Sequence, residues 1–126
     1  MINNPYQKYQ QAAVQTSGPQ LILMLYDGAI KFVRAGIEGI EGRNAEKANA
    51  NLQKAQRIIN ELIASLNFDY EVSSNLVLVY EYWIHQLIQA NSRKVVEPAR
   101  EVLNYLVDVR ETWATAMKKP TVESMQ

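Results

Sequence analysis

Residues 45–66 read AEKANANLQKAQRIINELIASL, and this stretch decides the fold. Its apolar residues recur at alternating spacings of four and three, at Ala48, Leu52, Ala55, Ile59, Leu62 and Leu66. This spacing places them on one face of an α-helix. A single apolar stripe on an otherwise polar helix is typical of a helix that packs in a bundle.

Three further segments carry helical periodicity, and capping residues mark their ends. Ser17 is expected to cap the first helix, and the Gln20 side chain to accept a hydrogen bond from the backbone N–H of Ser17. Pro19 falls in the first turn, where its missing N–H costs little. Gly42 is expected to end that helix in the left-handed conformation, and Asn44 to cap the next one. The expected helices cover residues 17–41, 45–66, 71–91 and 95–118, and Pro98 falls in the first turn of the last.

Four long helices joined by short connections predict an all-α fold, an antiparallel four-helix bundle with a short N-terminal helical cap segment. The expected organisation is a cap segment over 1–16, the bundle over 17–118 and a frayed tail over 119–126. No stretch alternates in the manner of a β-strand.

Composition excludes several classes of function. The 126 residues include 13 Lys plus Arg and 13 Asp plus Glu, so zero net charge gives no electrostatic reason to bind nucleic acid. Cysteine is absent, which removes disulfides, thiol nucleophiles and thiolate metal sites. No apolar run approaches the length of a transmembrane helix, and the N-terminus has no signal-peptide pattern. We therefore expect a cytoplasmic protein without membrane insertion.

The helix expected over residues 17–41 has more apolar surface than a bundle helix needs. Its expected core face carries Ile22, Leu25, Ala29, Phe32 and Gly36. Its apolar arc covers roughly two thirds of the circumference, against the three-in-seven face that is usual. The third helix shows a similar excess beside its core stripe of Val72, Leu76, Val79, Tyr80, Trp83 and Leu87. The candidate binding residues on the flanks are Leu21, Met24, Tyr26, Ile30, Val33 and Ile37, with Val77, Ile84 and Ile88 on the third helix.

Two interpretations of this excess stay open. The extra residues are half exposed or hidden in a homodimer, or they form a groove for another chain. The small residues Gly28, Ala35 and Gly39 favour close approach of a neighbouring backbone. A glycine inside a helix lowers the stability of the helix by about 1 kcal/mol relative to alanine. We therefore expect a packing reason for the glycines in this helix.

The N-terminal segment also allows two interpretations. Tyr6, Tyr9 and Ala13 fall on one face of a short helix, which is too short to be stable without docking. It is either a fixed helix that completes the core or a detachable lid over the apolar surface.

Chemistry-bearing residues are few. His85 is the only histidine, and it shares the polar face of its helix with Ser74, Glu81 and Ser92. The di-iron Glu-x-x-His motif and the glycine-rich phosphate loop are both absent. We therefore expect no enzyme, no cofactor and no metal, and a histidine phosphotransfer bundle using His85 is the alternative. Arg110 lies on the apolar side of its helix and is expected to snorkel or to pair with an acidic residue of another helix.

Five stretches together resemble the flagellar secretion chaperone family FliS. They read NPYQKYQQ at 4–11, LMLYDGAIKF at 23–32, NLQKAQRIINEL at 51–62, LIQAN at 87–91 and VRETW at 109–113. The resemblance runs from about Asn4 to Met117. Residues 84–86, IHQ, depart from it, since relatives often carry arginines there.

The resemblance implies a cytoplasmic chaperone that binds the C-terminal segment of flagellin before export. That segment is disordered in the free monomer and wraps the bundle as helices in the complex. The chaperone thereby blocks premature polymerisation and delivers its client to the flagellar type III export gate. Other flagellar regulators are further implied partners. The family also implies an N-terminal cap that covers part of the client site and moves on binding.

Overall fold

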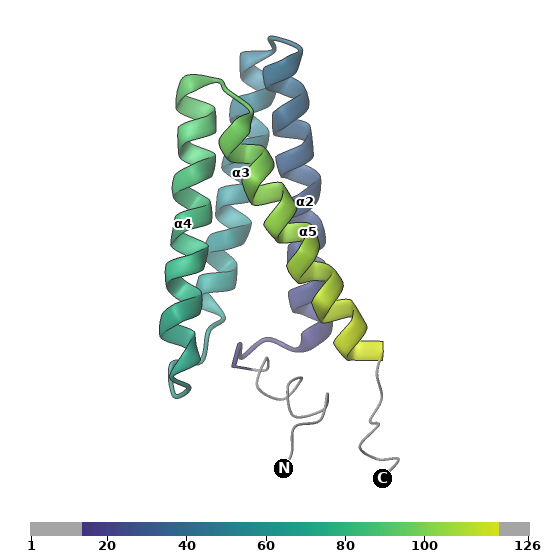
Figure 1. The fold of residues 1–126 in the computed structure, drawn as a ribbon, viewed down its shortest axis with the longest axis vertical. Helices are drawn as coiled ribbons and strands as arrows, with labels where there is room; N and C mark the ends of the chain where they lie inside the picture. Colours follow the sequence, from purple (N-terminus) through teal and green to yellow (C-terminus); the bar gives the residue numbers. More distant parts are fainter. Residues whose placement is uncertain (1–13, 119–126) are drawn as a thin grey trace.

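The computed structural model describes residues 14–118, and the regular elements in this range are α-helices. They are α2 (Pro19–Glu41), α3 (Ala45–Ala64), α4 (Val72–Arg93) and α5 (Glu97–Lys118). Successive helices run in opposite directions, side by side (Figure 1). The predicted all-α four-helix bundle is confirmed. None of the described helices combines the length and apolar character needed to cross a bilayer.

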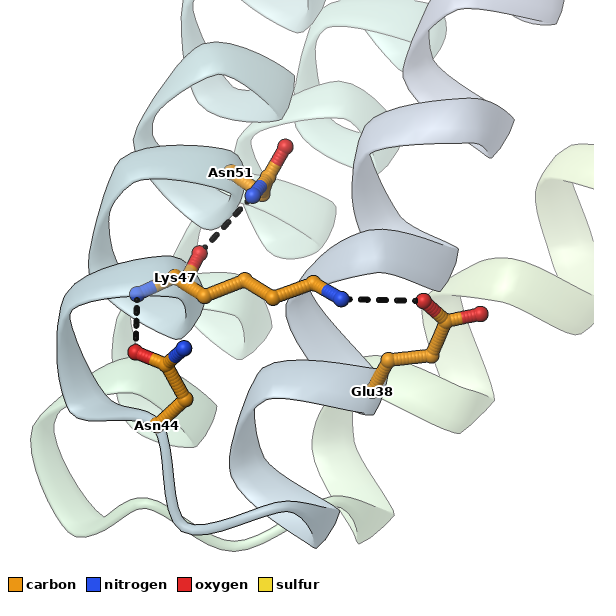
Figure 2. A network of polar contacts seen from close by, with 4 residues as sticks. All are labelled: Glu38, Asn44, Lys47 and Asn51. Carbon is orange, nitrogen blue, oxygen red and sulfur yellow. Dashed lines mark hydrogen bonds and ion pairs between the residues drawn. The ribbon is translucent and has the colours of Figure 1, made fainter.

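Some of the predicted capping residues do end or begin a helix, and others do not. Asn44 caps α3 by accepting a hydrogen bond from the backbone nitrogen of Lys47 at 3.0 Å. The same lysine extends its Nζ to Glu38 of α2 at 3.2 Å, so the cap and the α2–α3 connection are joined (Figure 2). α3 ends at Ala64, two residues before the predicted end at Leu66.

Two predicted caps of α2 are wrong. Its N-cap is Gly18 rather than Ser17, and no side chain caps it. Gly42 has φ −89°, whereas Arg43 takes the left-handed conformation with φ 56°. The N–H of Asn44 bonds to the carbonyl of Gly39, and that of Arg43 to Ile40. This is a Schellman motif, in which the left-handed residue is the one after the C-cap, so it falls one residue later than predicted.

α2 and α3 approach closely through glycines. A Cβ at position 39 would lie 2.5 Å from the backbone nitrogen of Ala48, and one at position 36 would lie 2.5 Å from a Leu52 methyl. The small residues of α2 therefore leave room for the backbone of α3, which belongs to the same chain.

Burial corrects the predicted faces of α2. Tyr26, Ile30, Val33 and Ile37 were expected outside the core, yet each is at most 8% exposed. That expectation is wrong because α2 packs against both α3 and α5, which buries a wider arc than one neighbour would. Leu25 and Phe32 of the expected core face are only half-buried and lie at its edge.

α5 is tied to α2 by ion pairs. Arg110 Nε donates to Asp27 Oδ1 at 2.7 Å, and Arg100 pairs with Glu41. The expectation that Arg110 pairs with an acid of another helix is confirmed. In Figure 1, α5 starts beside the C-terminal end of α4 and then crosses toward α2. α4 and α5 therefore diverge along their length.

We expect Gly39→Ala to destabilise the bundle by about 1–3 kcal/mol, because the new methyl group meets backbone atoms that cannot rotate away. Gly28→Ala is the matched control, since its Cβ would meet only the terminal Cδ1 of Ile58, at 3.0 Å. The gain in helix propensity, about 1 kcal/mol, offsets that adjustment. Urea unfolding measures both. Equal losses of stability would contradict the close backbone approach at Gly39.

Candidate functional site

The divergence of α4 and α5 leaves a cavity of about 520 Å³. Its lining places it between the first half of α4 and the second half of α5. These parts of the two helices lie at the end of the bundle where the described chain begins (Figure 1). We call it the α4–α5 groove. Its lining residues are Val14, Gln15, Tyr26, Tyr70, Glu71, Val72, Leu76, Tyr80, Val109 and Trp113.

Aromatic rings beside the groove hold one another in place. Trp83 lies 5.4 Å from Tyr80 and 6.4 Å from Tyr26 between ring centroids, and meets Tyr26 nearly edge-on at 78°. On its other side it stacks with Tyr105 at 6.4 Å and 21°. Such pairs add stability beyond the area they bury. The wall that these rings form is therefore pre-organised.

A chain of buried hydrogen bonds runs beneath the groove. The hydroxyls of Tyr26 and Tyr80 lie 2.9 Å apart, and that of Tyr80 donates to Gln15 Oε1 at 3.3 Å. Gln15 Nε2 donates onward to the Leu62 carbonyl at 3.2 Å and to Ser65 Oγ at 2.9 Å. Burial raises the pKa of both tyrosines, so each phenol keeps its proton and can donate. These bonds join α2, α3 and α4 to the residues that precede α2.

Residues 14–16 are fixed to the end of α3. The N–H of Thr16 donates to the Ser65 carbonyl, and the N–H of Asn67 donates to the carbonyl of Val14. Val14 and Gln15 are 1% and 3% exposed, and both line the groove. The described part of the chain therefore begins at the groove.

The structure separates the candidate binding residues predicted from the sequence. Tyr26 is the one described candidate that lines the groove, and Ile30, Val33 and Ile37 are in the core. The remaining candidates are divided between exposed positions at Leu21, Met24 and Ile88 and half-buried positions at Val77 and Ile84. Tyr6 and Tyr9 lie outside the described residues.

Sequence reasoning missed most of the groove. Leu76 and Tyr80 lie on the predicted core stripe and do pack in or against the core, but they also line the opening, as does Val72. Val72 belongs to the predicted core stripe of the same helix, yet 44% of it is exposed. Helical periodicity identifies the inward face of a helix, but it carries no signal for where the neighbouring helix turns away.

His85 is exposed on α4, as are Ser74, Glu81 and Ser92 on the same polar face. From Val72 to Ser92 this helix contains no Lys or Arg that could hold a phosphoryl group. Across residues 14–118, no group of three His, Cys, Asp or Glu side chains could hold a metal ion.

Fold and groove together define the class of protein, a helical bundle with a docking groove between two of its helices. A bundle with a largely apolar opening between two helices is suited to bind an amphipathic helix of another chain, which is a recurrent mode of recognition.

Comparison with known proteins gives the particular family. The chain matches the family described as "Flagellar protein FliS" over residues 2–120. A relative from Bacillus subtilis (strain 168) is 42% identical over 118 residues, which cover 93% of this chain and 89% of the relative. A Salmonella typhimurium relative is 36% identical over 118 residues, covering 90% and 87%, and one from Escherichia coli (strain K12) is 31% identical over 117 residues, covering 90% and 85%. All three are named "Flagellar secretion chaperone FliS".

The chain belongs to the FliS family of flagellar secretion chaperones. The resemblance drawn from the five sequence stretches is thereby confirmed. The family is a class of export chaperones rather than of enzymes.

Proposed function

We propose that this protein is a cytoplasmic chaperone that binds the C-terminal segment of flagellin in the α4–α5 groove. It keeps the client from polymerising and delivers it to the flagellar type III export gate. The observation that carries the proposal is the groove itself, which presents apolar side chains of α4 and α5 at an open end of the bundle. The names of the relatives support secretion of a flagellar client.

The physical demands of export fit such a groove. A client segment that orders only on binding must offset its ordering entropy by burying apolar surface. An amphipathic helix places residues i, i+3, i+4 and i+7 on one face, which suits an elongated apolar groove. The ordering cost lowers the net affinity, so the export machinery can remove the client without nucleotide hydrolysis by the chaperone.

We predict that Val72→Asp weakens binding of full-length flagellin at least about tenfold, or about 1.4 kcal/mol. The carboxylate enters the apolar groove and must lose water when the client docks. Folding is spared, because residue 72 is 44% exposed and an acid in the first turn of a helix is favourable. Isothermal titration calorimetry measures the affinity.

Val95→Asp is the matched control, since Val95 is 36% exposed in the α4–α5 connection, outside the groove. Its affinity should equal that of the wild type. Flagellin lacking its C-terminal segment should not bind either variant. Equal effects of the two substitutions would contradict the groove as client site, and binding of the truncated flagellin would contradict the choice of segment.

We further propose that the part of the predicted cap segment that precedes Val14 acts as a lid that competes with the client through Tyr6 and Tyr9. Its support is that Val14 and Gln15, the first described residues, already line the groove. Tethering at this point gives a lid a high effective concentration. The client must then wait for the open state.

Tyr9→Ala should therefore speed flagellin association in stopped-flow measurements and leave the release rate unchanged. Faster release would instead identify Tyr9 as a retained client contact. Unchanged rates would assign the segment to the fixed fold. Either of these two results contradicts the lid.

A further inference from the structure

Basic residues are absent from the middle of α4 and of α5. α4 has no Lys or Arg between Val72 and Ser92, and α5 has none between Glu101 and Val109. The arginines on either side of that part of α5, Arg100 and Arg110, form ion pairs with α2. Glu101 and Asp108 therefore lie in a stretch of α5 that contains no basic residue, although the whole chain is neutral.

Exposed aromatic and aliphatic side chains occupy the same part of the surface. Tyr82 is 44% exposed and Tyr105 48%, and Leu78 and Val79 of α4 are also exposed. The Tyr82 hydroxyl donates to both carboxylate oxygens of Glu101, at 3.0 and 2.9 Å, which joins α4 to α5. Tyr105 is held by its stacking on the buried Trp83. The two exposed rings are thus fixed before any partner arrives.

Acidic side chains of α5 lie beside these rings. Glu101 lies four residues before Tyr105 on α5 and Asp108 three after it, so the three share one side of the helix. We call this surface the acidic aromatic face and define it by Tyr82, Glu101, Tyr105 and Asp108.

We propose that the acidic aromatic face docks an amphipathic stretch of the flagellin client whose polar flank carries Lys or Arg; this rests on the proposed function. Opposite charges at the rim of an interface steer encounter and fix orientation. Exposed tyrosine rings additionally attract cationic side chains over their faces. Val109 lines the groove and follows Tyr105 by four residues, about one helical turn, so the face adjoins the groove along α5.

The test compares two double variants that remove the same charge from different faces. Glu101→Gln with Asp108→Asn neutralises the acidic aromatic face and keeps the acceptor for Tyr82. Glu46→Gln with Glu61→Gln neutralises two exposed acids of α3 and serves as the control. Circular dichroism checks that both fold. Stopped-flow association with full-length flagellin is followed from low to high salt.

At low salt we expect the first double variant to associate about tenfold more slowly than wild type and to lose most of the salt dependence. The control should stay within about twofold. Tyr105→Leu, which keeps an apolar side chain but removes the ring, should speed release.

Equal slowing of both double variants would show steering by net charge and would overturn the proposal. So would unchanged association and release in every variant of the face. In that case Val72→Asp, if it still weakens binding, leaves the groove as the client site. Binding of a second copy of this chain, seen as salt-sensitive self-association in sedimentation, would assign the face to a dimer instead. Failure of the wild type to bind flagellin overturns both proposals.

Discussion

The close approach of α2 to α3 sets the geometry of the remaining helices. At Gly36 and Gly39 a side chain of any size would meet atoms of α3, so these two helices form a tight pair. α5 also packs against α2, to which Arg100 and Arg110 attach it through ion pairs. Because α5 follows α2 rather than α4, it separates from α4 along its length. The α4–α5 groove is the consequence of that separation.

A buried polar chain ties the residues that line the groove to three helices. The hydroxyl of Tyr80 joins Tyr26 to Gln15, and Gln15 reaches the end of α3. Buried hydrogen bonds of this kind specify one arrangement, since leaving a partner unsatisfied costs about 1–3 kcal/mol. The same bonds fix the start of the described chain beside the groove. The proposed lid is therefore tethered next to the proposed client site.

Sequence periodicity predicted the helices well, and some helix ends have a local cause that the sequence shows, as at Asn44 and Pro19. It also predicted that Arg110 finds an acid, since a cation on an apolar face needs one. It failed at Ile30 and Val33, because the width of a buried arc depends on how many helices touch it. It placed Leu76 and Tyr80 correctly on an inward stripe, but it gave no sign that they also line an opening. Only the three-dimensional course of α5 leaves them there.

Amide hydrogen exchange with and without the C-terminal segment of flagellin tests the location of the client site most directly. If the α4–α5 groove holds the client, protection increases in residues 70–80 and 105–113. Residues 36–52, where α2 and α3 meet, should exchange as they do in the free protein. Protection confined to the α2–α3 surface, with no change in α4 and α5, would contradict the account.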